Sequence, residues 1–308
     1  MKRIFVAIAA VALTAAAASA QDFNAAVDAF NAGVQALETN KKDALDHFRE
    51  AFNIAGQLGE SEAQELADKC KELIPGTLLS IAKEQINDGQ YDEALATLDE
   101  TKTLASGYGV ENIFNDADAL IPNVLLRKGS SLLKDKDYAN AAAALKELTD
   151  LQPENGQAFL LLGQAFLQNG NTADAVAALE KANGMGEAQA AKLLSTTYLK
   201  QGQALLKANK NAEAVEALQK SNQFAESANA YKLMASAYTK LGKTKDAIAA
   251  YKQYLVVNPN AQDAADINFT IAATAQKAGD KATATEYYKK LAGTKYAAQA
   301  EAQLKVLQ

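Results

Sequence analysis

The sequence predicts an all-α fold, namely an α-solenoid built from repeated helix-turn-helix pairs. Three observations carry this prediction. Ala makes up 67 of the 308 residues while Gly and Pro number 17 and 4, a balance that favours helix. Short polar clusters recur along the chain at intervals of a few tens of residues, as in repeat proteins. Between these clusters, the apolar residues recur with the period of an α-helix.

The polar clusters predict the turns between helices. Each cluster contains Gly, Asn or Lys among polar neighbours, which suits a residue that closes a helix in the left-handed conformation. With one marker residue taken from each cluster, the successive spacings are 47, 34, 39, 33 and 37 residues. The markers are Gly89, Lys136, Gly170, Asn209, Gly242 and Gly279. The spacings predict about seven helix pairs.

The apolar residues beside each turn resemble the tetratricopeptide repeat family. In residues 159–182, Phe159, Leu162, the small Gly163 and Phe166 match the first helix of that repeat, and Ala175, Leu179 and Ala182 match the second. Residues 231–259 are similar to the same pattern and end on Pro259, although Tyr254 stands where the family has a small or aliphatic residue. Further copies centre on the following small residues: Ala32, Ala82, Gly129, Gly202 and Ala272. The resemblance implies a right-handed superhelix.

Small residues are expected where the two helices of a pair cross. Gly163 and Ala175 lie twelve residues apart, on opposite sides of a turn. Because neither carries a bulky side chain, the antiparallel helices approach closely there, and large neighbours such as Leu179 fill the remaining space. We therefore expect Gly163 and Ala235 to be buried.

Residues 21–308 are interpreted as a single solenoid without a linker. Residues 67–83 and 114–130 align with a shift of 47, which predicts elongated repeats over 21–121 and regular repeats over 122–296. The extra residues are expected to lengthen helices. Pro75 and Pro122 either begin new helices, where the missing N–H costs nothing, or kink long ones. Residues 297–307 predict a last, capping helix.

Residues 1–20 have the pattern of a secretory signal peptide. Lys2 and Arg3 precede an apolar run, and Ala18-Ser19-Ala20 is typical of a cleavage site before Gln21. No Cys follows that site, so no lipid anchor is expected, and no later segment predicts a membrane span. The sequence thus indicates an exported, periplasmic protein. The alternative is an N-terminal helix retained in the fold.

The sequence offers no catalytic, metal or cofactor motif. One His and one Cys cannot form a zinc site, and the net charge of −6 gives no support for nucleic-acid binding. His47 is expected to be solvated or hydrogen-bonded on a helix, and Cys70 to be a small packing residue. We therefore expect no enzyme and no cofactor.

Side chains on the first helix of each pair are the candidate binding residues. The resemblance implies that these helices line a concave groove that holds a protein or peptide. The residues expected there are Lys83, Leu126, Arg127, Ser130, Leu160, Gln164, Leu199, Gln203, Lys232 and Ser236. Leu126, Leu160 and Leu199 are expected to form an exposed apolar stripe. The family's clamp for acidic C-terminal peptides uses Lys and Asn; Lys232 fills one such place, but Ser or Gln occupies the Asn places.

A row of lysines near the ends of the first helices has two interpretations. Lys134, Lys207, Lys240 and Lys277 recur at similar places. They form either a basic rim of the groove or simple helix C-caps, since a cation near a helix C-terminus is favourable.

Three functions remain open at this point. The first is a non-enzymatic scaffold of the bacterial cell envelope that binds a protein or peptide partner. The second is a periplasmic protein that binds a solute or glycan, and the third is a structural protein that self-associates. The oligomeric state is not predicted.

Overall fold

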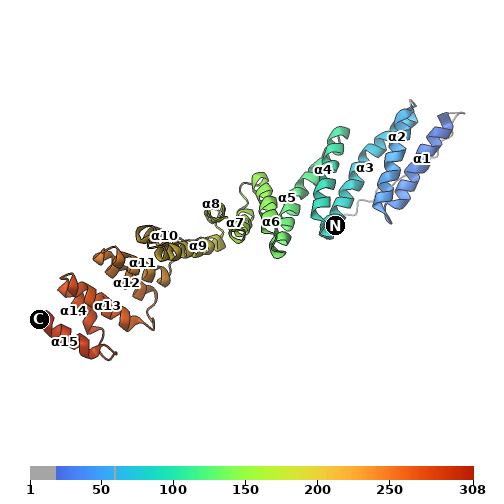
Figure 1. Ribbon diagram of the computed structural model, residues 1–308. Coiled ribbons are helices and arrows are strands. Elements are labelled where there is room, and N and C mark those ends of the chain that lie inside the picture. The colour runs from blue at the N-terminus through green and yellow to red at the C-terminus, as the bar shows by residue number, and fades with distance from the viewer. Residues whose placement is uncertain (1–18, 59) are drawn as a thin grey trace. The chain divides into compact units, whose positions relative to one another are not determined.

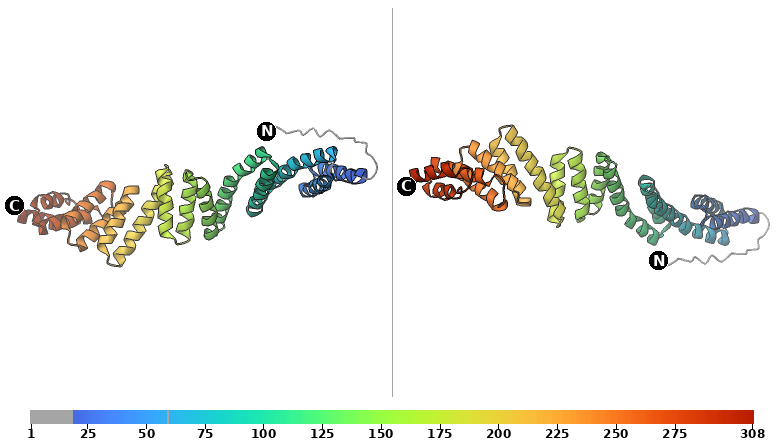
Figure 2. Two further views of the ribbon diagram at one scale, coloured as in Figure 1. Left: turned by 90° about the horizontal axis from the view of Figure 1, so that it is seen from above. Right: turned by 90° about the horizontal axis from the view of Figure 1, so that it is seen from below.

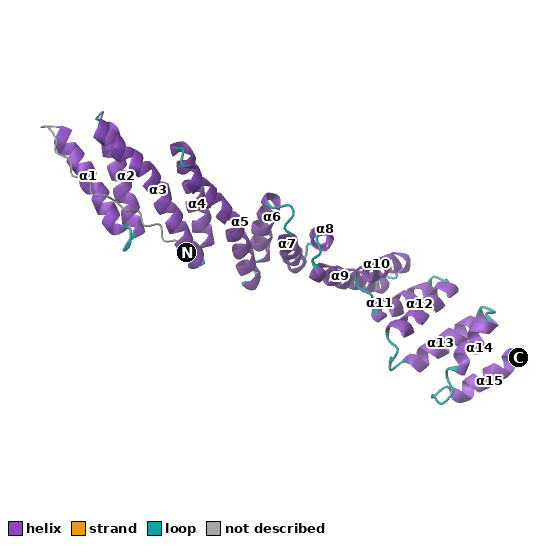
Figure 3. Cartoon of the chain, turned by 180° about the vertical axis from the view of Figure 1, so that it is seen from behind, coloured by secondary structure: helices purple, strands orange, loops and turns teal. Residues whose placement is uncertain are grey.

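A computed structural model describes residues 19–58 and 60–308, and the described residues fold into 15 α-helices without a strand (Figures 1 and 3). Within residues 19–135 and within residues 136–308, successive helices pack side by side as antiparallel pairs. The all-α prediction of repeated helix pairs is confirmed. The expected signal sequence falls almost entirely on residues 1–18, outside the described residues.

The contacts divide the chain into two units, and each is described by itself. The N-terminal unit ends at Asp135 and contains α1 to α5. These helices span Ser19–Ala36, Lys41–Gln57, Ser61–Asn87, Tyr91–Tyr108 and Glu111–Lys134. The C-terminal unit begins at Lys136 and contains α6 to α15. Those helices span Tyr138–Leu151, Gly156–Gln168, Thr172–Gly184, Ala188–Lys207, Asn211–Phe224, Ala228–Lys240, Thr244–Val257, Ala264–Lys277, Lys281–Lys289 and Ala297–Leu307. The interpretation of a single continuous solenoid stays a prediction.

The extra residues of the N-terminal unit lengthen its helices, as the shift of 47 predicts. Helix α3 has 27 residues and α5 has 24, whereas α7 and α8 have 13 each. Pro75 lies inside α3 and Pro122 inside α5, so neither proline begins a helix. The long helices continue through them, although a proline supplies no N–H to the carbonyl four residues earlier.

The six marker residues all lie in the left-handed region, which confirms the turn predictions. Their φ angles run from 60° to 84°. Four of them are Gly, and Asn209 (φ 60°) is of a type that tolerates this conformation, whereas the side chain of Lys136 (φ 63°) makes it costly. Side-chain oxygens cap the beginnings of several helices by accepting backbone N–H groups; these are Asn40, Asp137, Asn155 and Asp280.

Small residues lie where paired helices cross, and the clearest case is Gly163. A Cβ on this residue would lie 2.6 Å from Cγ of Leu179 and 3.3 Å from the carbonyl oxygen of Ala175, so only Gly permits this approach. Gly202 meets Leu218 at the same distance. Gly163 is buried and Ala235 is fully buried, as predicted.

The first helix pair differs from its predicted alignment by one residue. The sequence assigns the small crossing position of α1 to Ala32, but Gly33 occupies it. A Cβ on Gly33 would lie 2.7 Å from the ring of Phe48 and 3.2 Å from the carbonyl oxygen of Ala44. The spacing from the small residue to the alanine of the second helix is thus 11 residues here and 12 in the pair α7–α8. Ala32 itself is only half-buried.

Each unit contains apolar clusters that lie between its helices. Phe23, Phe30 and Phe48 belong to a cluster of buried residues contributed by α1, α2 and α3. In the C-terminal unit, Ile271, Tyr288 and Leu291 belong to a cluster that joins α12 to α15. Helix α15 has the bounds predicted for the last helix, and its Ala300 is buried in that cluster. The stacking of each pair on its neighbours supplies the burial that a single pair lacks.

Candidate binding face on the first helices

The predicted groove residues divide between the two units. Lys83 lies on α3, while Leu126, Arg127 and Ser130 lie on α5, all in the N-terminal unit. The other six lie on α7, α9 and α11 of the C-terminal unit. Within that unit, Gln164, Gln203 and Ser236 each follow the small crossing residue of their helix, so they occupy one register on successive first helices. That all ten line one groove stays a prediction.

The prediction that Leu126, Leu160 and Leu199 form an exposed stripe is wrong for Leu160. Leu160 is buried, with 7% of its surface exposed. Leu126 and Leu199 are half-buried, and Leu199 packs against a core cluster that contains Leu218 and Met234. A residue at this register lies at the border between the core and the open face. A leucine there turns its apolar surface to the adjacent helix because that removes it from water.

Lys232 stays exposed at the same register but has an internal partner. Its Nζ donates to Oδ2 of Asp263 at 2.5 Å, and the hydroxyl of Tyr254 donates to Oδ1 of the same carboxylate at 2.5 Å. The hydrogen bond to Asp263 raises the pKa of Lys232 above its ordinary value. Burial acts to raise the pKa of Asp263, but hydrogen bonds from Lys232 and Tyr254 outweigh it, and the pKa is lowered. The lysine at the clamp position is therefore neutralised by the chain itself.

Tyr254, the one large departure from the repeat pattern in residues 231–259, has a role in this cluster. Its side chain is buried, with 6% of its surface exposed, and only its hydroxyl reaches Asp263. A small or aliphatic residue would leave Asp263 without this donor. The ammonium of Lys232 also lies 5.6 Å from the centre of the Tyr254 ring.

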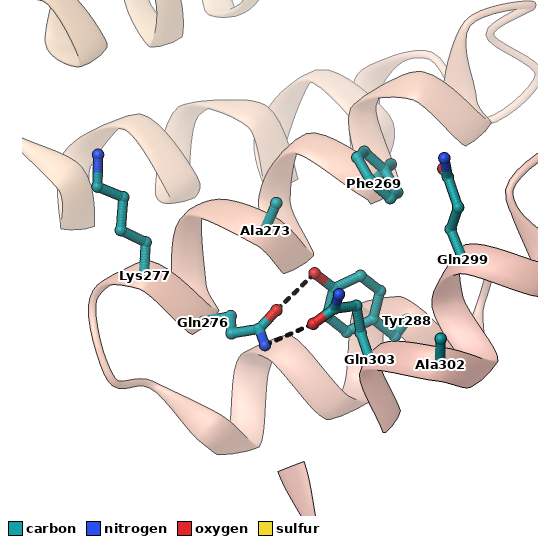
Figure 4. Close-up of a pocket in the computed structure, with 8 residues that line it drawn as sticks. All are labelled: Phe269, Ala273, Gln276, Lys277, Tyr288, Gln299, Ala302 and Gln303. Atoms are coloured by element: carbon teal, nitrogen blue, oxygen red, sulfur yellow. Dashed lines mark hydrogen bonds between the residues drawn. The ribbon is translucent and has the colours of Figure 1, made fainter. Parts of the chain in front are cut away.

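An open hollow of about 570 Å³ lies between α13, α14 and α15 (Figure 4). Its lining residues are Phe269, Ala273, Gln276, Lys277, Tyr288, Gln299, Ala302 and Gln303. The hydroxyl of Tyr288 donates to Oε1 of Gln276 at 2.7 Å, and Nε2 of Gln276 donates to Oε1 of Gln303 at 2.8 Å. Burial raises the pKa of Tyr288 above its ordinary value, which keeps its hydroxyl protonated as a donor.

The sequence reasoning missed this hollow, although the register could have revealed it. A shift of 37 residues carries Ala235 onto Ala272, and the same shift carries Lys232 and Ser236 onto Phe269 and Ala273. Both of these residues line the hollow. The first-helix face therefore continues one pair beyond Ser236, to the end of the C-terminal unit.

A second aspartate cluster fixes the loop before α15. Asp266 accepts the hydroxyl of Tyr296 at 2.6 Å and pairs with Lys295 at 2.5 Å. The hydrogen bonds from Lys295 and Tyr296 lower the pKa of Asp266. The ring of Tyr296 stacks on Phe269 with a centroid distance of 4.6 Å. One face of Phe269 is thus already covered by a side chain of this chain.

The remaining candidate residues lie away from this face. Cys70 is fully buried, as its packing role predicts, and burial raises the pKa of its thiol to about 12. Nδ1 of His47 lies 3.6 Å from a carboxylate oxygen of Glu50 on the same helix. No group of three or more His, Cys, Asp or Glu side chains suited to a metal ion occurs among the described residues.

The four recurring lysines all end their helices. Lys134, Lys207, Lys240 and Lys277 are the last residues of α5, α9, α11 and α13, and all four are exposed. This placement suits helix capping and a basic rim equally, so both interpretations stay open. Among them, Lys277 alone lines the described hollow.

A comparison with protein families matches part of the chain. The family model of the tetratricopeptide repeat matches residues 126–190 and 199–265. These two segments are similar to that repeat. The matched segments contain every predicted groove residue except Lys83, and they cover less than half of the 308 residues. A comparison with curated proteins found no significant match.

Solved structures with tetratricopeptide-like helix pairs are similar to parts of the chain. A crystal structure of MamA is 22% identical and covers 57% of this chain and 95% of its own, with a TM-score of 0.32. A crystal structure of PilW, a type IV pilus biogenesis factor, is 19% identical over 56% of this chain and 76% of its own, with a TM-score of 0.28. The TPR2AB domain of yeast Sti1 in complex with pHSP90 is 14% identical over 77% and 99%, with a TM-score of 0.31.

No helix in residues 19–58 and 60–308 combines the length and apolar character that a membrane span requires.

Proposed function

We propose that this chain is a non-enzymatic scaffold that binds a protein or peptide partner on the first-helix face of its C-terminal unit. The observation that carries the proposal is the row of polar side chains at one register of that face. Gln203 and Ser236 are half-buried, and neither side chain makes a hydrogen bond within the C-terminal unit. A half-buried amide or hydroxyl without a partner is suited to the backbone of an incoming peptide.

Two other observations support binding rather than chemistry. Tetratricopeptide repeats are generally non-catalytic interaction modules, and they cover the face in question. Among the titratable groups near this face whose pKa is shifted, Asp263 and Lys232 satisfy one another. Such mutual pairing is structural and leaves neither group available as an acid or base.

Partner capture with matched variants tests the proposal. Gln203→Arg places a bulky cation on the first-helix face, whereas Gln223→Arg makes the same change at an exposed position of the second helix α10. The wild-type chain is immobilised, and captured proteins are identified by mass spectrometry. We expect Gln203→Arg to lose specific partners that Gln223→Arg retains. Equal capture by both variants would refute the assignment of the face.

We also propose that the protein is exported and acts in the bacterial cell envelope, with cleavage after Ala20. The support is the sequence pattern of residues 1–20, together with the burial of Phe23 on α1, after the expected cleavage site. Cleavage before Gln21 would leave that core contact intact. The full-length chain, produced in a Gram-negative host, should appear in the periplasmic fraction with an intact mass that begins at Gln21. A cytoplasmic, uncleaved product would contradict export.

The solute- or glycan-binding alternative has weaker support. Sugar rings stack on exposed aromatic faces, but of the two aromatic residues at the hollow Phe269 is stacked on Tyr296 and Tyr288 is buried. No contact among the described residues favours self-association. We therefore retain the scaffold as the proposed function.

A further inference from the structure

We propose that copies of this chain associate head to tail, with the acidic first halves of α3 and α5 in one copy against the lysine-rich turns α11–α12 and α13–α14 of another. The inference goes beyond the proposed function, because neither surface includes any of the ten expected groove residues. Contacts within one copy do not bear on this pairing, and the argument rests on the charges that each surface exposes.

The two units carry charge of opposite sign. Residues 19–135 contain 21 Asp and Glu against 10 Lys and Arg, whereas residues 136–308 contain 16 against 19. The N-terminal unit is therefore strongly acidic and the C-terminal unit weakly basic. Complementary charges on different surfaces orient two molecules and bring them together. The N-terminal unit of one copy is thus suited to the C-terminal unit of another.

The excess of acid lies where the first helices of the N-terminal unit exceed the regular length. The regular first helix α7 has 13 residues, and the last 13 residues of α3 and of α5 begin at Pro75 and Pro122. The residues before these prolines, 60–74 and 111–121, contain eight Asp and Glu against two Lys. We call these segments the acidic extensions. Because α4 packs against both helices, and α3 and α5 also contact each other, the extensions belong to neighbouring helices (Figure 1).

Most carboxylates of the acidic extensions have no ion pair with a described residue. Asp68 pairs with Lys71 on its own helix, and Asp118 pairs with Lys102 on α4. The remaining six are Glu60, Glu62, Glu65, Glu72, Glu111 and Asp116, and all of them except the half-buried Glu60 are exposed. The chain itself therefore leaves most of this charge unbalanced.

Four acidic residues of α3 follow one another along one exposed stripe. Glu62, Glu65, Asp68 and Glu72 are spaced by three or four residues, on the side away from the buried residues of that helix. Like charges at these spacings destabilise a helix, and Lys69 offsets only one of them. A favourable position at the helix start accounts for Glu62 but not for the three later residues. Cations from a neighbouring molecule would remove this repulsion.

The turns α11–α12 and α13–α14 supply a matching set of cations. Residues 240–246 and 277–281 contain five lysines against Asp246 and Asp280. All five lysines are exposed, and none forms an ion pair with a described residue. In Figure 4 the ammonium of Lys277 points away from Gln303. We call these residues the lysine edge: Lys240, Lys243, Lys245, Lys277 and Lys281.

The two turns of the lysine edge lie close together. The backbone N–H of Thr283 donates to Asp280 and lowers the pKa of its carboxyl group, and the charges of Lys252 and Lys245 on α12 act in the same direction. The ammonium of Lys252 also lies 5.1 Å from the centre of the Tyr287 ring on α14. Since Asp280 already caps α14, it offsets little of the positive charge that the edge presents to a partner.

A second copy of the chain matches both surfaces at once. Six carboxylates without an ion pair would meet five lysines without one, so the contact would be nearly balanced in charge. An anionic membrane or a nucleic acid would satisfy the lysine edge alone and leave the acidic extensions unmatched. Because the two surfaces differ, the contact is heterologous, and it produces open chains or closed rings of copies rather than a two-fold dimer.

Sedimentation velocity of the purified protein tests the inference. In about 0.05 M salt the wild type should form species that grow with concentration, and about 0.5 M salt should return it to monomer, because exposed charges are then screened. One variant neutralises the lysine edge with Lys243→Gln, Lys245→Gln and Lys281→Gln. A second neutralises the acidic extensions with Glu65→Gln, Glu72→Gln and Asp116→Asn. Each variant alone should associate at least about tenfold more weakly than the wild type.

Mixing the two variants gives the decisive result. Each retains the surface that the other has lost, so an equimolar mixture should form a one-to-one dimer that grows no further. The matched control removes three other exposed lysines, with Lys192→Gln, Lys200→Gln and Lys305→Gln, and should associate like the wild type. Circular dichroism checks that all variants are folded.

Four outcomes would overturn the inference: a wild type that stays monomeric in low salt, association that survives high salt, equal weakening in the control, or a mixture that stays monomeric. The result is separable from partner capture, since none of these substitutions touches the first-helix face that Gln203→Arg tests.

Discussion

The two units hold successive helices together by different side-chain contacts. In the N-terminal unit, ion pairs join different helices: Lys41 with Glu84, Arg49 with Glu100, Lys102 with Asp118 and Lys128 with Asp92. In the C-terminal unit, hydroxyl and amide groups link helices directly, as in the bonds of Tyr288, Gln276 and Gln303, while the ion pairs of Asp263 and Asp266 join connecting segments to helices. Both units share the close crossing at a small residue, Gly33 or Gly163.

The two units also differ in helix length. Helices α3 and α5 have 27 and 24 residues, and their Glu84 and Lys128 pair with Lys41 on α2 and Asp92 on α4. Helices α7 and α8 have 13 residues each, and their crossing is the close apolar contact of Gly163 with Leu179. Ion pairs at exposed positions contribute little, whereas close crossings are sensitive to a single methyl group.

The largest effect is expected at the crossing of α7 and α8. Gly163→Ala puts a methyl group 2.6 Å from Cγ of Leu179 and should lower the free energy of unfolding by about 1–3 kcal/mol. The matched change Gly76→Ala, in the middle of α3, meets only Ile113 at an ordinary 3.6 Å and should stabilise by about 0.5–1 kcal/mol. Urea unfolding measures both. A stabilising Gly163→Ala would show that the helices cross elsewhere.

The next effect concerns a buried hydroxyl pair between α9 and α10. The Ser221 hydroxyl donates to the carbonyl oxygen of Ser195 at 2.8 Å and lies 3.1 Å from the Ser195 hydroxyl. Ser221 is fully buried, so Ser221→Ala should cost about 0.5–1.5 kcal/mol by removing this hydrogen bond, while the Ser195 hydroxyl keeps the carbonyl oxygen of Ala225 as its acceptor. Hydrogen exchange should localise the lost protection to α9 and α10. A variant as stable as the wild type would make the pair irrelevant to stability.

A smaller effect is expected for the ion pairs of the N-terminal unit. Arg49 and Glu100 join α2 to α4, and their side chains remain 39% and 47% exposed. A double-mutant cycle with Arg49→Met and Glu100→Gln should give a coupling free energy of about 0.2–1 kcal/mol. The coupling should vanish in concentrated salt, because exposed charges are screened. A coupling that survives there would indicate a pair removed from solvent.

The smallest expected effect is the pH dependence of stability that arises from Asp266, near the end of the C-terminal unit. Hydrogen bonds from Lys295 and Tyr296 lower the pKa of Asp266, which is therefore lower in the folded than in the unfolded chain. Such a group stabilises the fold above its unfolded pKa of about 3.9, and the contribution is lost as the pH falls through the folded value. Melting temperatures between about pH 5 and pH 2 should fall less steeply for Asp266→Asn. If the melting temperatures of the wild type and of Asp266→Asn fell in parallel with pH, the lowered pKa of Asp266 would be contradicted.

Local features of the sequence predicted the turns and crossings, because each depends on residues close together in the chain. The left-handed markers and the burial of Gly163 are of this kind. The burial of Leu160 was not predictable, since a side chain at the border of the face is buried or exposed according to its own chemistry and its neighbours. Lys232, at the same register, stays exposed.

The internal neutralisation of Lys232 also lay beyond the sequence pattern. Asp263 lies 31 residues away, in the segment before α13, and no periodicity relates it to α11. The same holds for the relay from Tyr288 to Gln303, which joins α14 to α15 through α13. The first contact involves a residue outside the helices, and the second joins helices that are distant in sequence, so a pattern within one repeat predicts neither.

Site-specific photo-crosslinking tests most directly the claim that the first-helix face of the C-terminal unit binds the partner. A benzoylphenylalanine is introduced singly at Ser236 on α11 or at Gln223 on α10, and the chain is irradiated with its captured partner. The account predicts a crosslinked product from position 236 and none from position 223. Crosslinking from position 223 but not from position 236 would contradict it.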